Sequence, residues 1–85
     1  MSKKEKLLRR FLSRPTDFTW DELVSLLGGF NFNLNNSSGS SHCCFVSGDD
    51  PSKVIRTCRP HPSPILKNYQ IREIIKFLEE EELLP

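Results

Sequence analysis

The sequence predicts an α+β domain in which a three-stranded antiparallel sheet packs on helices. Apolar residues recur at helical spacing near both ends of the chain, which is typical of amphipathic helices. The middle of the chain instead has short apolar segments, with alternating or β-branched residues, separated by polar loops. Strands joined by short loops pair antiparallel, and helices grouped outside such a sheet cover one of its faces. The predicted order is therefore helix, helix, three strands and helix.

The first third of the chain predicts two helices. Residues 2–5 (SKKE) have the form of a capping box, and the helical pattern after them ends before Pro15. Residues 19–22 (TWDE) form a second capping box. Residues 28–29 (GG) predict the end of this helix, because glycine accepts the left-handed conformation that a helix C-cap often needs. The apolar stripes of the two helices consist of Leu7, Leu8, Phe11 and Leu12, and of Leu23, Leu26, Leu27 and Phe30.

The middle of the chain predicts three strands. Residues 30–34 alternate apolar and polar side chains, which is the period-two pattern of a half-buried strand. The Asn, Ser and Gly residues of 35–41 are typical of a turn, and residues 42–47 predict the second strand. A loop over residues 48–52 leads to the third strand, over residues 53–58, which is rich in β-branched side chains.

The last part of the chain predicts an irregular connection and a final helix. Three prolines within residues 59–64 exclude regular structure there. Asn68 is the expected N-cap of the final helix, and an apolar face follows it at helical spacing. This face consists of Ile71, Ile74, Ile75 and Leu78. At 85 residues the chain is long enough for one small domain, so we expect residues 1–85 to form a single unit.

Composition excludes several classes of protein. No run of 18 or more apolar residues exists, which argues against a membrane span. Charged residues interrupt the segment after the basic N-terminus, so we read no secretory signal and expect a cytoplasmic protein. The three cysteines, two of them adjacent, do not make a disulfide framework and are expected to act as small buried hydrophobes. The chain has no P-loop, dinucleotide-binding glycine pattern or H-E-x-x-H motif.

Charge is unevenly distributed along the chain, although the net charge is only +1. Residues 1–14 carry six cations against Glu5 alone, and residues 53–76 carry six more against Glu73 alone. Many of the balancing acids lie elsewhere, including four consecutive glutamates at residues 79–82. A nearly neutral chain can therefore present a basic face suited to a polyanion. Ordinary solvated helix surfaces have a similar composition, so charge alone leaves both interpretations open.

His42 is the first candidate for chemistry in this chain. It lies between a Gly/Ser turn and the apolar start of the second predicted strand. Histidine is the side chain whose unperturbed pKa, about 6.5, allows proton transfer near neutral pH. Alternate side chains of a strand face opposite sides, so we expect Phe45 and Cys43 to face the helices. His42 then lies on the open face or at the start of the strand, where an inert surface histidine is the competing interpretation.

Two other kinds of site remain open in the same region. A zinc site would use the four residues His42, Cys44, Cys58 and His61. Cys58 and His61 have C-x-x-H spacing, but structural zinc usually uses paired knuckles such as C-x-x-C. Cys44 is a candidate nucleophile two residues from His42, although no neighbouring residue supplies an oxyanion hole or an orienting carboxylate.

An ordered set of motifs resembles the HicA (YcfA-like) toxin family. The motifs are TWDEL at residues 19–23, LGGF at 27–30, GSSH at 39–42 with Phe45 three positions on, RPHP at 59–62 and LKNYQI at 66–71. The resemblance implies a double-stranded-RNA-binding-like fold. It also implies an mRNA-cleaving toxin that a HicB-type antitoxin holds inactive. The family core would cover residues 18–80, which makes residues 1–17 an N-terminal helical extension.

The resemblance assigns the family's catalytic histidine, in its Gly-Ser-His motif, to His42. A neutral imidazole can act as general base for an RNA 2′-hydroxyl, so cleavage would need no metal or cofactor. Backbone amides near the serines can hold a phosphate as a nest, and nearby cations can neutralise it. The expected RNA-binding residues are Gly39, Ser40, Ser41, Lys53, Arg56, Arg59 and His61. The basic N-terminal helix is expected to extend this cationic track. His61 is also a candidate general acid.

The site differs from the family pattern in two ways. One extra serine lies between Gly39 and His42, and residues 43–44 are cysteines where polar or basic residues are common.

Two rival functions remain. One is a non-catalytic RNA-binding module that keeps the basic face, and the other is a protein-interaction domain whose sheet edge or groove docks a partner.

Overall fold

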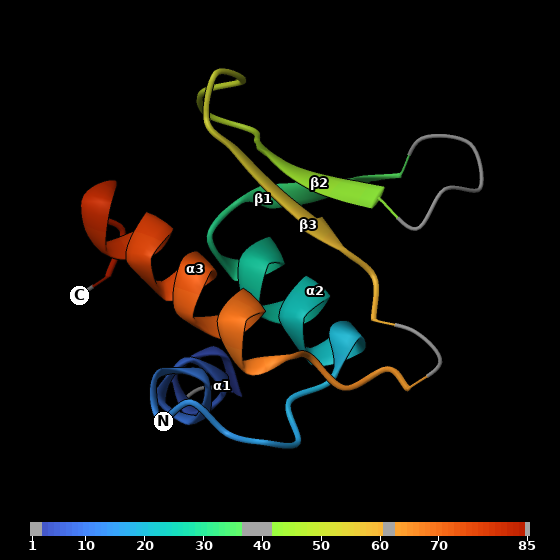
Figure 1. The fold of residues 1–85 in the computed structure, drawn as a ribbon. Coiled ribbons are helices and arrows are strands. Elements are labelled where there is room, and N and C mark those ends of the chain that lie inside the picture. The colour runs from blue at the N-terminus through green and yellow to red at the C-terminus, as the bar shows by residue number, and fades with distance from the viewer. Residues whose placement is uncertain (1–2, 37–41, 61–62, 85) are drawn as a thin grey trace.

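The computed structural model describes residues 3–36, 42–60 and 63–84 and has the predicted α+β architecture (Figure 1). Its elements are α1 (Lys3–Leu12), α2 (Trp20–Gly29), β1 (Phe32–Asn36), β2 (His42–Ser47), β3 (Val54–Cys58) and α3 (Asn68–Glu80). This order confirms the expected fold class. β1 begins and ends two residues later than the alternation of residues 30–34 predicts. Among the described residues, no helix has the length and apolar character needed to span a membrane.

The three strands form one antiparallel sheet with β2 in the centre, in the order β1-β2-β3. Leu34 of β1 is in register with Phe45 of β2, and Phe45 is in register with Ile55 of β3. Helices α2 and α3 lie against one face of this sheet (Figure 1). No described element covers the other face (Figure 1).

The core lies between the sheet and the helix pair. Phe45 is fully buried, and its ring centroid lies 5.6 Å from that of Trp20 at the start of α2. Phe32 of β1 meets Phe77 of α3 edge to face at 5.9 Å. The predicted stripe of the last helix is confirmed, and that of the second helix is confirmed except for Phe30, which follows the end of α2 and is half-buried. The buried residues of the two stripes are Leu23, Leu26, Leu27, Ile71, Ile74, Ile75 and Leu78.

Helix α1 lies on the side of α2 and α3 that faces away from the sheet (Figure 1). It buries Leu8 and Phe11, and the Phe11 ring packs 4.9 Å from that of Phe18 in the connection to α2. Leu12, predicted on the same stripe, is instead 38% exposed. The molecule therefore has three layers, which are the sheet, the pair α2 and α3, and α1.

The start of α2 is held by its own capping box and by an ion pair from α1. Glu22 Oε1 accepts a hydrogen bond from Thr19 N at 3.0 Å, and Glu22 N donates to Thr19 Oγ1 at 3.2 Å. This confirms the second predicted capping box, whereas Ser2 of the first lies outside the described residues. Arg10 forms ion pairs with Glu22 and with Asp17. The bond from Arg10, followed by those from Thr19, holds the pKa of Glu22 below its usual value.

In the turn after α2, the left-handed backbone conformation is adopted by an asparagine and not by the glycine that the sequence predicts. The helix ends at Gly29 as expected, but the residue with left-handed backbone is Asn31, with φ 63°. Asparagine adopts this conformation more readily than most residues because its short polar side chain can hydrogen-bond locally. Asn31 O accepts from Gly48 N at 2.8 Å, which connects this turn to the loop after β2. A methyl group at Gly48 would lie 2.9 Å from Asn31 Nδ2, so a larger residue there would have to displace the Asn31 side chain.

The start of α3 also differs from the prediction. Asn68 is the first helical residue, and Lys67 occupies the N-cap position. The N-cap backbone is satisfied from inside the helix, because Gln70 Oε1 accepts from Lys67 N at 3.0 Å. The prediction that Asn68 caps the helix is therefore wrong by one residue.

Candidate functional site

The uncovered side of the sheet carries the residues that alternate with the core residues. Along β2 the buried residues are Cys43, Phe45 and Ser47, and the half-buried ones are Cys44 and Val46. The predicted direction of Phe45, toward the helices, is thus confirmed. Cys44 is in register with Asn35 of β1 and Arg56 of β3, and its Sγ donates to Asn35 O at 3.6 Å. We call this surface the open face, and its described members are Asn33, Asn35, Cys44, Val46, Val54, Arg56 and Cys58.

The backbone of His42 lies at one end of the central strand. It is the first residue of β2, as expected, and it is in register with Cys58, the last residue of β3. The side chain of His42 lies outside the described part of the structure. Arg56 is exposed two positions before Cys58, and Arg59 is exposed one position after it. At about 3.3 Å per residue, both arginines lie within ~7 Å of Cys58 along the strand direction.

Lys53 lies at the other end of the sheet. It immediately precedes β3, and its carbonyl accepts from Ser47 N at the far end of β2. Cys58 lies five positions further along the chain, or ~17 Å away along an extended strand. Its Nζ is also 3.4 Å from Glu81 Oε2 at the end of α3. The structure therefore brings Arg56 and Arg59, but not Lys53, to the end of the sheet where β2 begins.

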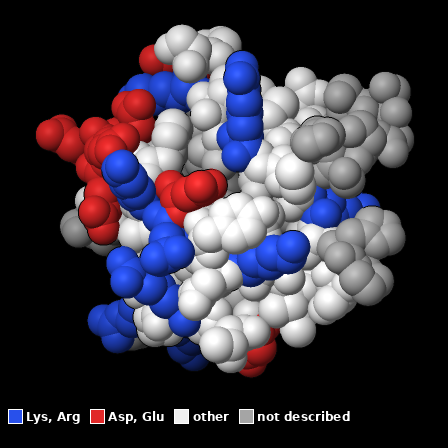
Figure 2. All heavy atoms as spheres, in the orientation of Figure 1, with Lys and Arg blue, Asp and Glu red and all other residues white. Residues whose placement is uncertain are grey.

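The cations of the N-terminal helix occupy a separate surface. Lys and Arg side chains gather over α1, and Asp and Glu side chains gather near the C-terminal end of α3 (Figure 2). Helices α2 and α3 lie between α1 and the sheet (Figure 1). The expectation that the basic N-terminal helix extends a cationic track beside His42 is wrong, because the apolar side of α1 packs on the helices and not on the sheet.

Several predicted site residues lie outside the described residues, namely Gly39, Ser40, Ser41 and His61. The phosphate nest, the general acid and the zinc alternative therefore remain predictions. Cys43 is buried as expected, whereas Cys44 and Cys58 are half-buried on the open face. Within the described part of the chain, no cluster of three or more His, Cys, Asp or Glu side chains is arranged to hold a metal ion.

Gln70 supports this end of the sheet, although the sequence pattern does not single it out for that role. Its side chain is buried, and its Nε2 donates to Cys58 O at 2.8 Å and to Thr57 Oγ1 at 3.0 Å. Together with the bond from Lys67 N, these contacts join the start of α3 to the end of β3, at the residue in register with His42. The sequence feature that could have indicated this role is a glutamine at the third position of the helix, where capping boxes place Glu or Gln.

We expect Gln70→Glu to lower the free energy of unfolding by about 1–3 kcal/mol. A carboxylate can still accept from Lys67 N but cannot donate to Cys58 O, and it brings a negative charge into the buried position of Gln70 beside that carbonyl. Urea unfolding measures the change. Glu73→Gln, on the exposed side of the same helix, is the matched control and is expected to stay within ~0.5 kcal/mol of the parent. Equal stability of the two variants would contradict the assigned role of Gln70.

Comparison with known families gives one match. A family model described as the HicA toxin of bacterial toxin-antitoxin matches residues 20–79. The match covers α2, the whole sheet and nearly all of α3, and it leaves α1 outside. No curated protein and no solved structure matches the chain.

Proposed function

The chain belongs to the HicA toxin family of toxin–antitoxin systems, and we propose that it acts as a metal-independent mRNA endoribonuclease with His42 as general base. One observation carries the proposal. The family match spans the sheet whose central strand begins at His42, and we propose that this residue, in the GSSH motif, corresponds to the histidine of the family's Gly-Ser-His motif. We further propose that residues 18–80 form the family core and that residues 1–17 are an added extension, since the match begins only at Trp20.

The proposed reaction is an internal transesterification of RNA. His42 removes the proton of a 2′-hydroxyl, and the 2′-oxygen attacks the adjacent phosphorus. The bond from phosphorus to the 5′-oxygen breaks, and that oxygen takes up a proton. The products are a 2′,3′-cyclic phosphate and a 5′-hydroxyl. Because the RNA supplies its own nucleophile, the histidine has only to accept a proton and to be positioned beside the 2′-hydroxyl.

Two arginines are the proposed phosphate ligands. Arg56 is exposed on the open face, and Arg59 follows the end of β3 that is in register with His42. Their planar guanidinium groups match phosphate geometry and can bind it through two hydrogen bonds. Exposed Asn33 and Asn35 add neutral hydrogen-bonding groups along β1. Lys53 is not retained in this role, because it lies at the opposite end of the strand and pairs with Glu81.

A protein antitoxin is the proposed partner of the open face. The family belongs to toxin–antitoxin systems, and we propose a HicB-type antitoxin that blocks RNA by covering this surface. The open face and the two edge strands β1 and β3 are not covered by any described element, which leaves room for such a partner (Figure 1). Action on mRNA also implies a cytoplasmic location.

Incubation of the purified chain with a mixed-sequence RNA in EDTA tests the proposal. We expect cleavage that continues in EDTA, and fragments that end in 2′,3′-cyclic phosphate and begin with 5′-hydroxyl. A non-catalytic RNA-binding module would bind this RNA, with an affinity that falls steeply with salt, and leave it intact. A protein-interaction domain would neither cleave it nor bind it. Either result would overturn the proposed nuclease.

A further inference from the structure

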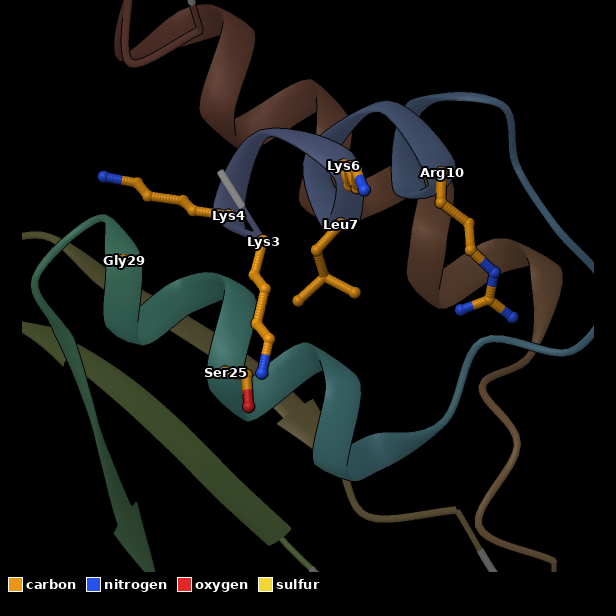
Figure 3. Close-up of a pocket in the computed structure, with 7 residues that line it drawn as sticks. All are labelled: Lys3, Lys4, Lys6, Leu7, Arg10, Ser25 and Gly29. Atoms are coloured by element: carbon orange, nitrogen blue, oxygen red, sulfur yellow. The ribbon is translucent and has the colours of Figure 1, made fainter. Parts of the chain in front are cut away.

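A groove lies between α1 and α2, on the side of the helices away from the sheet (Figure 3). Its volume is about 470 Å³. The floor and the α2 side consist of Leu7, Ser25 and Gly29. The surrounding cations are Lys3, Lys4, Lys6 and Arg10. We call this surface the α1–α2 groove.

The lysines around the groove are available for a partner. Three of them are exposed, namely Lys3, Lys4 and Lys6. Within the described residues, these lysines form no ion pair with a carboxylate. Arg10 differs, because Asp17 and Glu22 already neutralise it, and it forms one end wall of the groove. The groove therefore carries a local positive charge, and the ammonium group of Lys4 also lies 5.6 Å from the centroid of the Phe30 ring.

The interior of the groove is apolar. Leu7 is half-buried and points from α1 toward α2 (Figure 3). At the opposite end, the Lys4 side chain lies close against Gly29 of α2, where a methyl group would lie 2.8 Å from Lys4 Cε. The aliphatic stems of the lysines line the walls, while their ammonium groups can stay in water. An aliphatic side chain can enter such a groove with carboxylates on either side of it.

We propose that the α1–α2 groove docks an acidic segment of a partner protein through a leucine-like side chain flanked by carboxylates. The aliphatic group packs on Leu7 and the lysine stems, and Lys3 and Lys6 meet the carboxylates. An RNA backbone would satisfy the lysines but has no aliphatic group for Leu7. This surface is separated from the open face by α2 and α3, so the inference is independent of the proposed nuclease activity (Figure 1). Helix α1 lies outside the family match, which makes the groove an additional feature of this chain.

Fluorescence anisotropy with a labelled synthetic peptide tests the inference on the full chain. The probe has Glu and Leu at helical spacing, and a second probe has every Leu replaced by Ser. We expect the Glu/Leu peptide to bind, and the Glu/Ser peptide to bind at least tenfold more weakly. The double variant Lys3→Glu/Lys6→Glu is expected to weaken binding at least tenfold. Acidic residues in the first turn of a helix are favourable, so the variant should remain folded, which circular dichroism checks.

The matched control is Arg72→Glu/Lys76→Glu, which makes the same change of net charge on the exposed side of α3. Binding of the Glu/Leu peptide to this control should stay within twofold of the parent. The inference is overturned if the peptide does not bind, if both double variants lose binding equally, or if both peptides bind equally. It is also overturned if mixed-sequence RNA, and not the peptide, depends on Lys3 and Lys6.

Discussion

His42→Ala is expected to reduce RNA cleavage by at least ~100-fold, because a positioned general base typically contributes about 10²–10⁴-fold to a rate. The fold should persist, since the change removes one side chain from the first residue of β2 and leaves the backbone pairing with Cys58 in place. The initial rate of RNA cleavage measures the effect, and growth inhibition in cells that express the variant gives a second readout. Circular dichroism shows whether the variant is folded.

Lys53→Ala is the matched control for this experiment. It removes a residue that lies beyond the other end of the sheet and pairs with Glu81. We expect this variant to cleave RNA at nearly the parent rate. A His42→Ala protein that cleaves as fast as the parent would show that His42 is not the base. Equal losses in both variants would point to a general effect of substitution and not to catalysis.

Phe45→Ala is expected to lower the free energy of unfolding by about 3–5 kcal/mol, the usual cost of removing a fully buried aromatic ring. The ring packs against Trp20, and its strand position lies between Leu34 and Ile55. Small domains are stable by only about 5–15 kcal/mol, so the variant should be partly unfolded at 37 °C. Urea unfolding, followed by circular dichroism, measures the change.

Val46→Ala provides the control on the adjacent position of the same strand. Val46 is half-buried on the open face, so we expect a loss of less than ~1.5 kcal/mol. A similar loss in both variants would contradict the assignment of Phe45 to the core and Val46 to the open face. Phe45→Ala should lose stability and cleavage together, whereas His42→Ala should lose cleavage alone. That difference distinguishes Phe45, which stabilises the strand, from His42, the proposed base at the start of the strand.

The sequence predicted the elements whose signals are local. The capping box at Thr19 and Glu22 forms as predicted, because both partners lie within one helical turn. The direction of Phe45 is also predictable, since alternation along a strand follows from backbone geometry. Predictions of helix ends were less successful, as the left-handed Asn31 and the N-cap at Lys67 show. Several residues can satisfy the same backbone requirement there, and contacts from elsewhere in the chain decide between them.

The candidate site was predictable in part. The position of His42 at the start of a strand follows from the turn-forming residues before it and the apolar residues after it. The sequence could not separate Arg56 from Lys53, because both lie in one basic stretch. The pairing of β3 with β2 places them at different distances from His42, and the ion pair with Glu81 engages Lys53 elsewhere.

The sequence by itself determined the class of fold, the order of its elements, the faces they bury and the family resemblance, since these follow from residue spacing along the chain. Only the tertiary structure decided where the charged surfaces lie. It placed α1 on the helices, away from the sheet, and so separated the cations of the α1–α2 groove from Arg56 on the open face (Figure 1). It also assigned Gln70 to the end of β3. These contacts join residues that are remote in sequence, and their geometry arises only when the layers pack together.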